Sequence, residues 1–273
     1  ARWIEPDGDL ERYLREKDRV RSAFPDVVFA EAPDTRAAQG EVLAMLADHL
    51  PLAHPSVYTR DGNAMRLPER RVVLDEPALP PLLRAGALVQ EDLVLIRRRE
   101  TGWHLAAGYV AFPSSWSLPE KFGRRMEEIH APVPGFGEGT RNAMLINRMF
   151  DNLKPDQPVH RFNWSINPDA DLHCPASKAH GALPGAPSVS LDETFVRVER
   201  QTLRRLPVSG DILFTIRIYA DPIAAVGTLP DAATVAATFA DQLEALEPAQ
   251  ARYKGLTEAR GGLIAGLRAL VTA

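Results

Sequence analysis

One histidine attracts attention because the residues around it could hold it against a flat ligand. His130 is followed by Pro132 and Pro134, which lack amide donors and end a helix, so it should lie in the last helical turn. Helical periodicity then stacks His130 on Met126 and, one turn further back, near Gly123. A flat ligand could approach where the glycine removes a side chain. A histidine that only interacts with the helix dipole fits the same pattern, and both interpretations stay open.

The segment before His130 has the signals that start a helix. Ser117 is placed to cap it, and Glu120 follows three residues later, which is the spacing of a capping box. The sequence therefore predicts one helix from Leu118 to Ala131. Lys121, in the first turns of this helix, is either solvated or in reach of an anion.

A second group of polar residues lies on a strand-like run, FVRVERQTLRRLP at 195–207. Strand alternation directs Arg197 and Glu199 to one face, and Arg200 and Arg204 to the other. Guanidinium groups pair with carboxylates or phosphates, so an anionic ligand would suit this strand. A solvated edge strand with cross-strand ion pairs is the alternative.

The composition and charge of the chain indicate which classes of protein and partner are expected. The chain has 273 residues, 45% of them hydrophobic and 25% charged, which is typical of globular proteins. The formal net charge of −4 provides no overall basic surface for nucleic acid. No stretch has the apolar length of a membrane span, and the N-terminal residues are charged rather than secretory. We therefore expect a cytoplasmic protein with no nucleic-acid or membrane partner.

Cysteine usage bears on redox chemistry. Cys174 is the only cysteine, so this chain can form neither an intrachain disulfide nor a four-cysteine iron–sulfur cluster. Any electrons for redox chemistry must therefore come from elsewhere. The seven histidines form no compact zinc motif, and His173 beside Cys174 lacks the further ligands that a zinc site needs.

The order of elements predicts the fold class. Strand-like runs form two hairpins, at 93–112 and 195–219, with a further strand at 158–168. Apolar periodicity predicts helices at 40–50 (ended by Pro51), 80–87, 140–153, 233–246 and 249–273. This layout is α+β, an antiparallel sheet flanked by helices. The Pro-, Gly- and Ser-rich segment 168–190 is either a loop over a site or a surface excursion.

Five ordered blocks carry a family resemblance: FPSSWSLPEKFG, IHAPVP, RFNW, VERQTLRRLP and ILFTIRIYADP. Together with VQED at 89–92 they resemble the haem-dependent oxidative N-demethylase alpha-subunit family over residues 89–222. The resemblance implies one haem-binding PAS-like domain over 1–273, with helical extensions at both ends. It also implies haem b, O2 and electrons from a separate flavin and iron–sulfur reductase. The implied reaction removes an N-methyl group from a small, dimethylamine-like secondary amine and releases formaldehyde.

The resemblance implies roles in haem binding for His130 and the residues near it. His130 becomes the first candidate for the axial iron ligand, because a b-type haem needs an imidazole nitrogen. Gly123 and Met126 would then lie beside the haem. His104 and His160 remain alternatives to His130 as the ligand.

The remaining polar candidates would bind the charged groups of haem and substrate. Arg200 and Arg204, with Lys121 as a weaker choice, could pair with the haem propionates. Glu199 and Asn163 could hold a cationic amine or the distal oxygen ligand, although Asn163 could equally stabilise a turn. A haem-based sensor or carrier, and a tailoring oxygenase acting on an amino-acid-like substrate, are the alternative functions.

Overall fold

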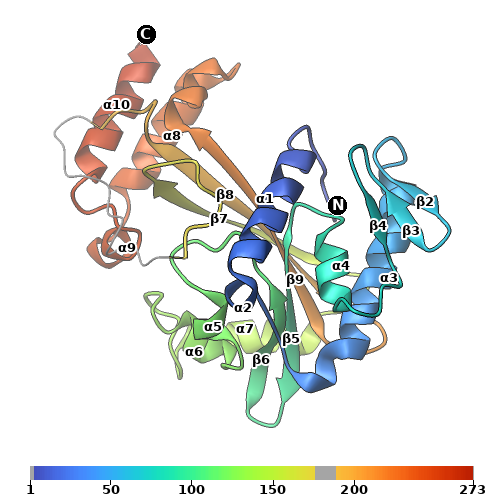
Figure 1. The fold of residues 1–273 in the computed structure, drawn as a ribbon. Coiled ribbons are helices and arrows are strands. Elements are labelled where there is room, and N and C mark those ends of the chain that lie inside the picture. The colour runs from blue at the N-terminus through green and yellow to red at the C-terminus, as the bar shows by residue number, and fades with distance from the viewer. Residues whose placement is uncertain (1–2, 176–188, 273) are drawn as a thin grey trace.

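The computed structural model describes residues 3–175 and 189–272 and is built around one six-stranded antiparallel sheet (Figure 1). The strands follow the spatial order β1-β6-β5-β9-β8-β7. Their bounds are β1 Phe29–Glu31, β5 Asp92–Arg99, β6 Gly102–Tyr109, β7 Val159–Asn167, β8 Phe195–Arg205 and β9 Ile212–Pro222. The predicted α+β class and both predicted hairpins are confirmed, while the likeness to a PAS fold stays a prediction.

Both faces of the central strands are buried, which explains their apolar runs. In β5, Leu93 and Leu95 belong to the core on one face, whereas Val94 and Ile96 belong to the core on the other. Strand β8 pairs with β7 on one side and β9 on the other. The interpretation of this arginine-rich strand as an edge strand is therefore wrong.

The first face of the sheet is covered by the N-terminal helices α1 Leu10–Ala23, α2 Pro25–Val28, α3 Arg36–Ala53 and α4 Pro81–Gly86. A short 3-10 helix, Pro33–Thr35, precedes α3. Pro51 lies inside the last turn of α3 instead of ending it, so the predicted boundary there is wrong. A small second sheet extends to one side of α3, as Figure 1 shows, and its strands are β2 Thr59–Asp61, β3 Ala64–Arg66 and β4 Arg71–Val73.

The second face carries three helices, α5 Leu118–Lys121, α6 Met126–His130 and α7 Arg141–Asn152. The capping box of Ser117 and Glu120 is confirmed, but the single helix predicted from Leu118 to Ala131 is wrong. Gly123 lies between α5 and α6 with φ +76°, a left-handed conformation that interrupts the helical path. The break places His130 on a different helix from the one that Ser117 caps.

The C-terminal helices pack on the outer strands through a third apolar cluster. A 3-10 helix, Ile223–Thr228, leads into α8 Ala232–Glu244, α9 Pro248–Tyr253 and α10 Arg260–Thr272. The helix predicted over 249–273 is thus two helices. Lys254 fastens this region to β7, because its ammonium group donates to the Trp164 carbonyl at 2.8 Å and lies 4.0 Å from the centre of the Trp164 ring. None of the helices in the described residues is long and apolar enough to cross a bilayer.

Candidate functional site

A hydrogen bond within α6 determines which ring nitrogen of His130 carries the proton. Its Nδ1 lies 2.8 Å from the Met126 carbonyl oxygen, so Nδ1 carries the proton and Nε2 keeps a lone pair. The predicted i, i+4 relation of these two residues is thereby confirmed. Burial lowers the pKa of His130 below its usual value, and nearby cations act in the same direction, so the ring is neutral at pH 7. A neutral imidazole with one nitrogen anchored on a carbonyl is the form that ligates metals.

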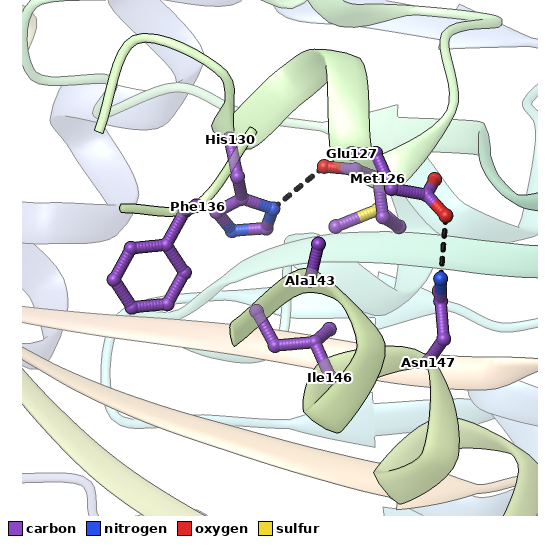
Figure 2. Close-up of a pocket in the computed structure, with 7 residues that line it drawn as sticks. All are labelled: Met126, Glu127, His130, Phe136, Ala143, Ile146 and Asn147. Atoms are coloured by element: carbon purple, nitrogen blue, oxygen red, sulfur yellow. Dashed lines mark hydrogen bonds between the residues drawn. The ribbon is translucent and has the colours of Figure 1, made fainter. Parts of the chain in front are cut away.

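His130 lines a small pocket between α6, α7 and the loop that joins them. Figure 2 shows the His130 ring beside Phe136, across from α7 side chains. The lining residues are Met126, Glu127, His130, Phe136, Ala143, Ile146 and Asn147. The space between these side chains is about 170 Å³ and is partly open to solvent, and it contains no cavity large enough for a water molecule. A ligand could enter here only if α6, α7 or the loop between them moved.

Two cations act on His130 from different elements. Lys121 of α5 and Arg161 of β7 both lower its pKa through their positive charge. The ammonium group of Lys121 donates to the Ile129 carbonyl at 3.3 Å, which ties α5 to α6. Lys121 is therefore close to His130, as expected for a group that could bind an anion there, and Arg161 is a candidate that the sequence did not indicate.

Gly123 does not lie beside His130 on a shared helix. It is exposed in the turn between α5 and α6, and its carbonyl oxygen accepts a hydrogen bond from His104 Nδ1 at 3.0 Å. The other ring nitrogen of His104 lies 2.8 Å from the Thr101 hydroxyl. Because both nitrogens of His104 are engaged, this histidine has no lone pair directed at a ligand.

Glu199 and Asn163 come together on neighbouring strands. They are directly paired in the β7–β8 register, and Asn163 Nδ2 donates to Glu199 Oε2 at 3.3 Å. Gln201 Nε2 donates to the same oxygen at 2.9 Å. The second carboxylate oxygen, Oε1, lies 3.9 Å from the Nε of Arg197. The side chain of Glu199 is 13% exposed, so the carboxylate is held in a fixed orientation and is still reachable.

Arg197 anchors this polar group to two loops. Its side chain is 1% exposed, and its guanidinium donates to the carbonyl oxygens of Phe112 at 2.6 Å and Leu172 at 3.2 Å. The residues that follow Phe112 include Ser115, which has a positive φ of 64° and pairs with the backbone of Cys174. Arg197 is thus structural, and the strand's arginines are not all available to a ligand.

Arg200 and Arg204 lie on the opposite face of β8 from Glu199, where the N-terminal segment covers them. Arg200 donates to the Trp3 carbonyl at 3.0 Å and pairs with Glu5 at 3.4 Å. The guanidinium of Arg204 stacks 4.7 Å from the centre of the Trp3 ring. The structure therefore does not bring these two arginines to the His130 pocket.

His160 lies on the Arg200 face of the sheet, paired in register with Thr202. Its Nε2 is buried without a hydrogen-bond partner, and burial together with Arg200 lowers the pKa of His160. This histidine thus keeps a free nitrogen, but it does not line the pocket that His130 lines. His160 remains the alternative that experiments must exclude.

The histidine–cysteine pair has local structural roles. His173 Nδ1 lies 2.7 Å from the Ala111 carbonyl oxygen, and the Cys174 thiol donates to the Asp171 carbonyl at 3.0 Å. No cluster of three metal-ligating side chains occurs among residues 3–175 and 189–272. Most of the loop predicted over 168–190, including His180, lies outside the described residues.

The loop after α6 and one face of α7 are the parts of the pocket that sequence analysis missed. Phe136 and Ile146 supply its apolar surface, and Asn147 Nδ2 donates to Glu127 Oε1 at 2.5 Å on the side remote from His130 (Figure 2). Apolar periodicity predicted the helix at 140–153, but Met144 and Leu145, two of the residues that carried this prediction, are exposed, whereas Ala143 and Ile146 face the pocket.

Comparison with protein families decides the identity of the chain. Residues 1–264 match the family model described as haem-dependent oxidative N-demethylase, alpha subunit-like. The chain belongs to this family. The description denotes an oxidoreductase that depends on haem and that is one subunit of an assembly.

The donor chemistry at His130 suits a haem ligand, whereas the space beside it, as it stands, does not hold a macrocycle. The neutral imidazole could bind iron through Nε2, and Phe136 and Ile146 would offer apolar contacts. Lys121 and Arg161 supply positive charge on the same side. The positions of Arg200 and Arg204 do not fit propionate binding at this pocket, because their guanidinium groups contact the N-terminal segment on the other face.

Proposed function

We propose that this protein is the haem-binding subunit of a monooxygenase that removes an N-methyl group from a small secondary amine. Membership of the family carries the proposal, and the protonation state of His130 supports it. The chain would work as one haem-binding unit, with residues from both ends packed on the same sheet. The overall reaction consumes the amine, O2, two electrons and two protons, and yields the demethylated amine, formaldehyde and water.

His130 would hold the haem iron through Nε2. The bound haem would supply the activation of O2 that amino-acid side chains cannot perform. The hydrogen bond from Nδ1 to the Met126 carbonyl fixes the orientation of the ring and makes Nε2 a better donor to a metal. Met126 packs beside the ring, and Lys121 and Arg161, whose positive charges act on His130, would pair with the propionates.

Glu199 and Asn163 would bind the substrate ammonium group. Two amide groups donate to Oε2 of Glu199 and fix the orientation of the carboxylate, which leaves Oε1 as the oxygen that would accept a hydrogen bond from the substrate. A secondary ammonium ion carries two N–H donors, so it can bridge the carboxylate and the Asn163 amide oxygen. This fixed orientation would hold one N-methyl group in a defined position for the reaction.

Electrons would come from a separate flavin and iron–sulfur reductase. The single cysteine excludes a four-cysteine cluster within this chain, and the family description as an alpha subunit supports a partner. The O2-dependent removal of a methyl group requires two electrons from outside in each turnover.

The test is substrate-dependent O2 consumption by the haem-loaded protein with an added reductant, using dimethylammonium and measuring formaldehyde. Glu199→Gln should raise KM about 10- to 100-fold, since a hydrogen bond to a charged group contributes about 1.5–3 kcal/mol. Glu258→Gln, at an exposed position on the C-terminal part, is the matched control and should leave KM unchanged. Haem-loaded protein that consumes no O2 with any small secondary amine would contradict the proposal.

A further inference from the structure

Strand β7 forms one outer edge of the six-stranded sheet, beside β8 (Figure 1). It has nine residues, whereas β1 at the opposite edge has only three. The open edge of a long strand presents main-chain N–H and C=O groups that can pair with a further strand. The groups that point outward from β7 therefore decide what can bind there.

The hairpin of β8 and β9 identifies these outward groups. Where β8 turns toward β9, the Leu206 N–H donates to the Asp211 carbonyl at 2.8 Å. Because hydrogen-bonded positions alternate along an antiparallel pair, the even-numbered residues of β8 bond to β9 and the odd-numbered residues bond to β7. Their partners in β7 are also odd-numbered. The N–H and C=O groups of His160 and Phe162 therefore point away from the sheet.

Two features limit the free part of this edge. The Lys254 ammonium group donates to the Trp164 carbonyl at 2.8 Å, so that carbonyl also points outward and is already bound. Pro158, directly before β7, has no amide donor. Within the part of the chain that the structure describes, no group bonds to the outward N–H or C=O of His160 or Phe162. We call these two residues and their free main-chain groups the β7 edge.

The side chains beside the β7 edge differ between the two faces of the sheet. Phe162 is 67% exposed on one face. Arg161 is exposed on the other face, and it forms no ion pair with any described residue. A strand that pairs here would cover Phe162 with its own alternate side chains and place the intervening ones opposite Arg161. Acidic side chains are favoured at those intervening positions, since opposite charges across strands attract.

A second copy of this chain does not suit the β7 edge. The antiparallel register that uses His160 and Phe162 of both copies pairs one with the other, and it sets Arg161 directly opposite the second copy's Arg161. Like charges at directly opposite positions are destabilising. A register centred on Phe162 would need the Trp164 carbonyl, which Lys254 already occupies. Charge and hydrogen bonding thus favour a different protein.

We propose that the β7 edge binds an extended acidic segment of another protein, which adds to the sheet as one antiparallel strand. The segment alternates apolar side chains that cover Phe162 with carboxylates that face Arg161. Its main chain exchanges hydrogen bonds with His160 and Phe162. The guanidinium of Arg161 has five N–H donors, so it can bind such a carboxylate on one side and a haem propionate on another. The family description as an alpha subunit agrees with a protein partner.

The test measures binding of a short blocked peptide of alternating valine and glutamate to the full chain by NMR. The amide signals of His160 and Phe162 should shift, and at saturation these amides should exchange with solvent at least about tenfold more slowly. Arg161→Glu should weaken binding at least about fivefold and make a valine–lysine peptide the better ligand. The matched control, Arg66→Glu on the small sheet, should stay within about twofold of wild type.

Main-chain pairing is tested separately from side-chain contacts. The valines lie opposite His160 and Phe162, so their amides point at β7 and their N-methylation should abolish binding. Methylation of the glutamate amides, which point away from β7, should leave binding within about twofold. In the protein, Phe162→Pro removes an outward donor and should weaken binding at least about fivefold. Proline is tolerated on an edge strand where the N–H faces solvent, so this variant should keep the wild-type unfolding midpoint.

The outcomes separate this inference from the proposed function. A valine–glutamate peptide that does not bind, or that binds equally well with methylated valine amides, would overturn the β7 edge as a docking site. Equal binding of the glutamate and lysine peptides would overturn the acidic partner. A dimer that Phe162→Pro converts to monomer would assign the edge to self-association and overturn the inference. Peptide binding needs no haem, so a failure here leaves the proposed function standing, and a failure to bind haem leaves this test intact.

Discussion

Lys17 offers a quantitative test because it is a buried cation whose charge can be removed by pH. The side chain of this α1 residue is 1% exposed, and its ammonium group donates to the carbonyl oxygens of Val89 at 2.9 Å, Gly86 at 3.3 Å and Glu91. Desolvation lowers the pKa of Lys17 from 10.5 to about 8, despite the favourable charges of Asp92 and Glu91.

The sign of the pH effect follows from this lowered pKa. Below pH 8 the folded protein must keep a charged ammonium group buried, which costs stability. Between pH 8 and 10.5 the unfolded chain binds the proton and the folded protein does not, so stability rises with pH. Integrating the two titrations from pH 7 to 9.5 gives a gain of about 2 kcal/mol from Lys17 alone.

The assay is urea unfolding of wild type and Lys17→Met at pH 7 and pH 9.5. We expect the free energy of unfolding of wild type, relative to the variant, to rise by about 2 kcal/mol over this interval. Lys154→Met, at an exposed position, should show no such change. A wild-type advantage that is constant, or that falls between the two pH values, would refute the assignment of Lys17 as a buried cation.

Three further results are expected from chemical unfolding. Gly86→Ala should lower the free energy of unfolding by about 2–3 kcal/mol, because the new Cβ would lie 2.3 Å from the Tyr109 ring. Gly40→Ala, in α3 with open space around it, should raise the free energy of unfolding by up to about 1 kcal/mol. Equal effects of the two substitutions would contradict the packing described. Arg197→Met should cost about 3–5 kcal/mol by removing a buried charge from its carbonyl partners, and a loss below 1 kcal/mol would contradict its anchoring role. Arg268→Met, at an exposed ion pair with Glu244, should change stability by less than about 1 kcal/mol.

The sequence predicted the sheet well because its strands are bounded by clear turn residues and have strong apolar patterns. The hairpin of β5 and β6 and the pairing of β8 with β9 could be read from the chain directly. The sequence did not predict the small sheet of β2, β3 and β4, because strands of three residues are too short to show an alternating pattern. The prediction that Pro51 ends its helix is wrong, because α3 continues for two residues beyond it.

The candidate site was only partly predictable. The i, i+4 contact of His130 with Met126 depends on helix geometry alone, so the sequence predicted it correctly. The positions of Arg200 and Arg204 depend on which segment covers each face of β8, and sequence alternation does not reveal that the N-terminal segment lies there. Phe136 likewise reaches the pocket through a loop whose path no periodic pattern describes.

Ligation of haem by His130 is tested most directly by the optical spectrum of the protein expressed with added haem. Spectra of the oxidised, reduced and CO-bound forms are compared for wild type, His130→Ala, His104→Ala and His160→Ala. We expect a Soret band in wild type that only His130→Ala loses or displaces. A folded wild-type protein without a Soret band, or a band that responds to His160→Ala and not to His130→Ala, would contradict the account.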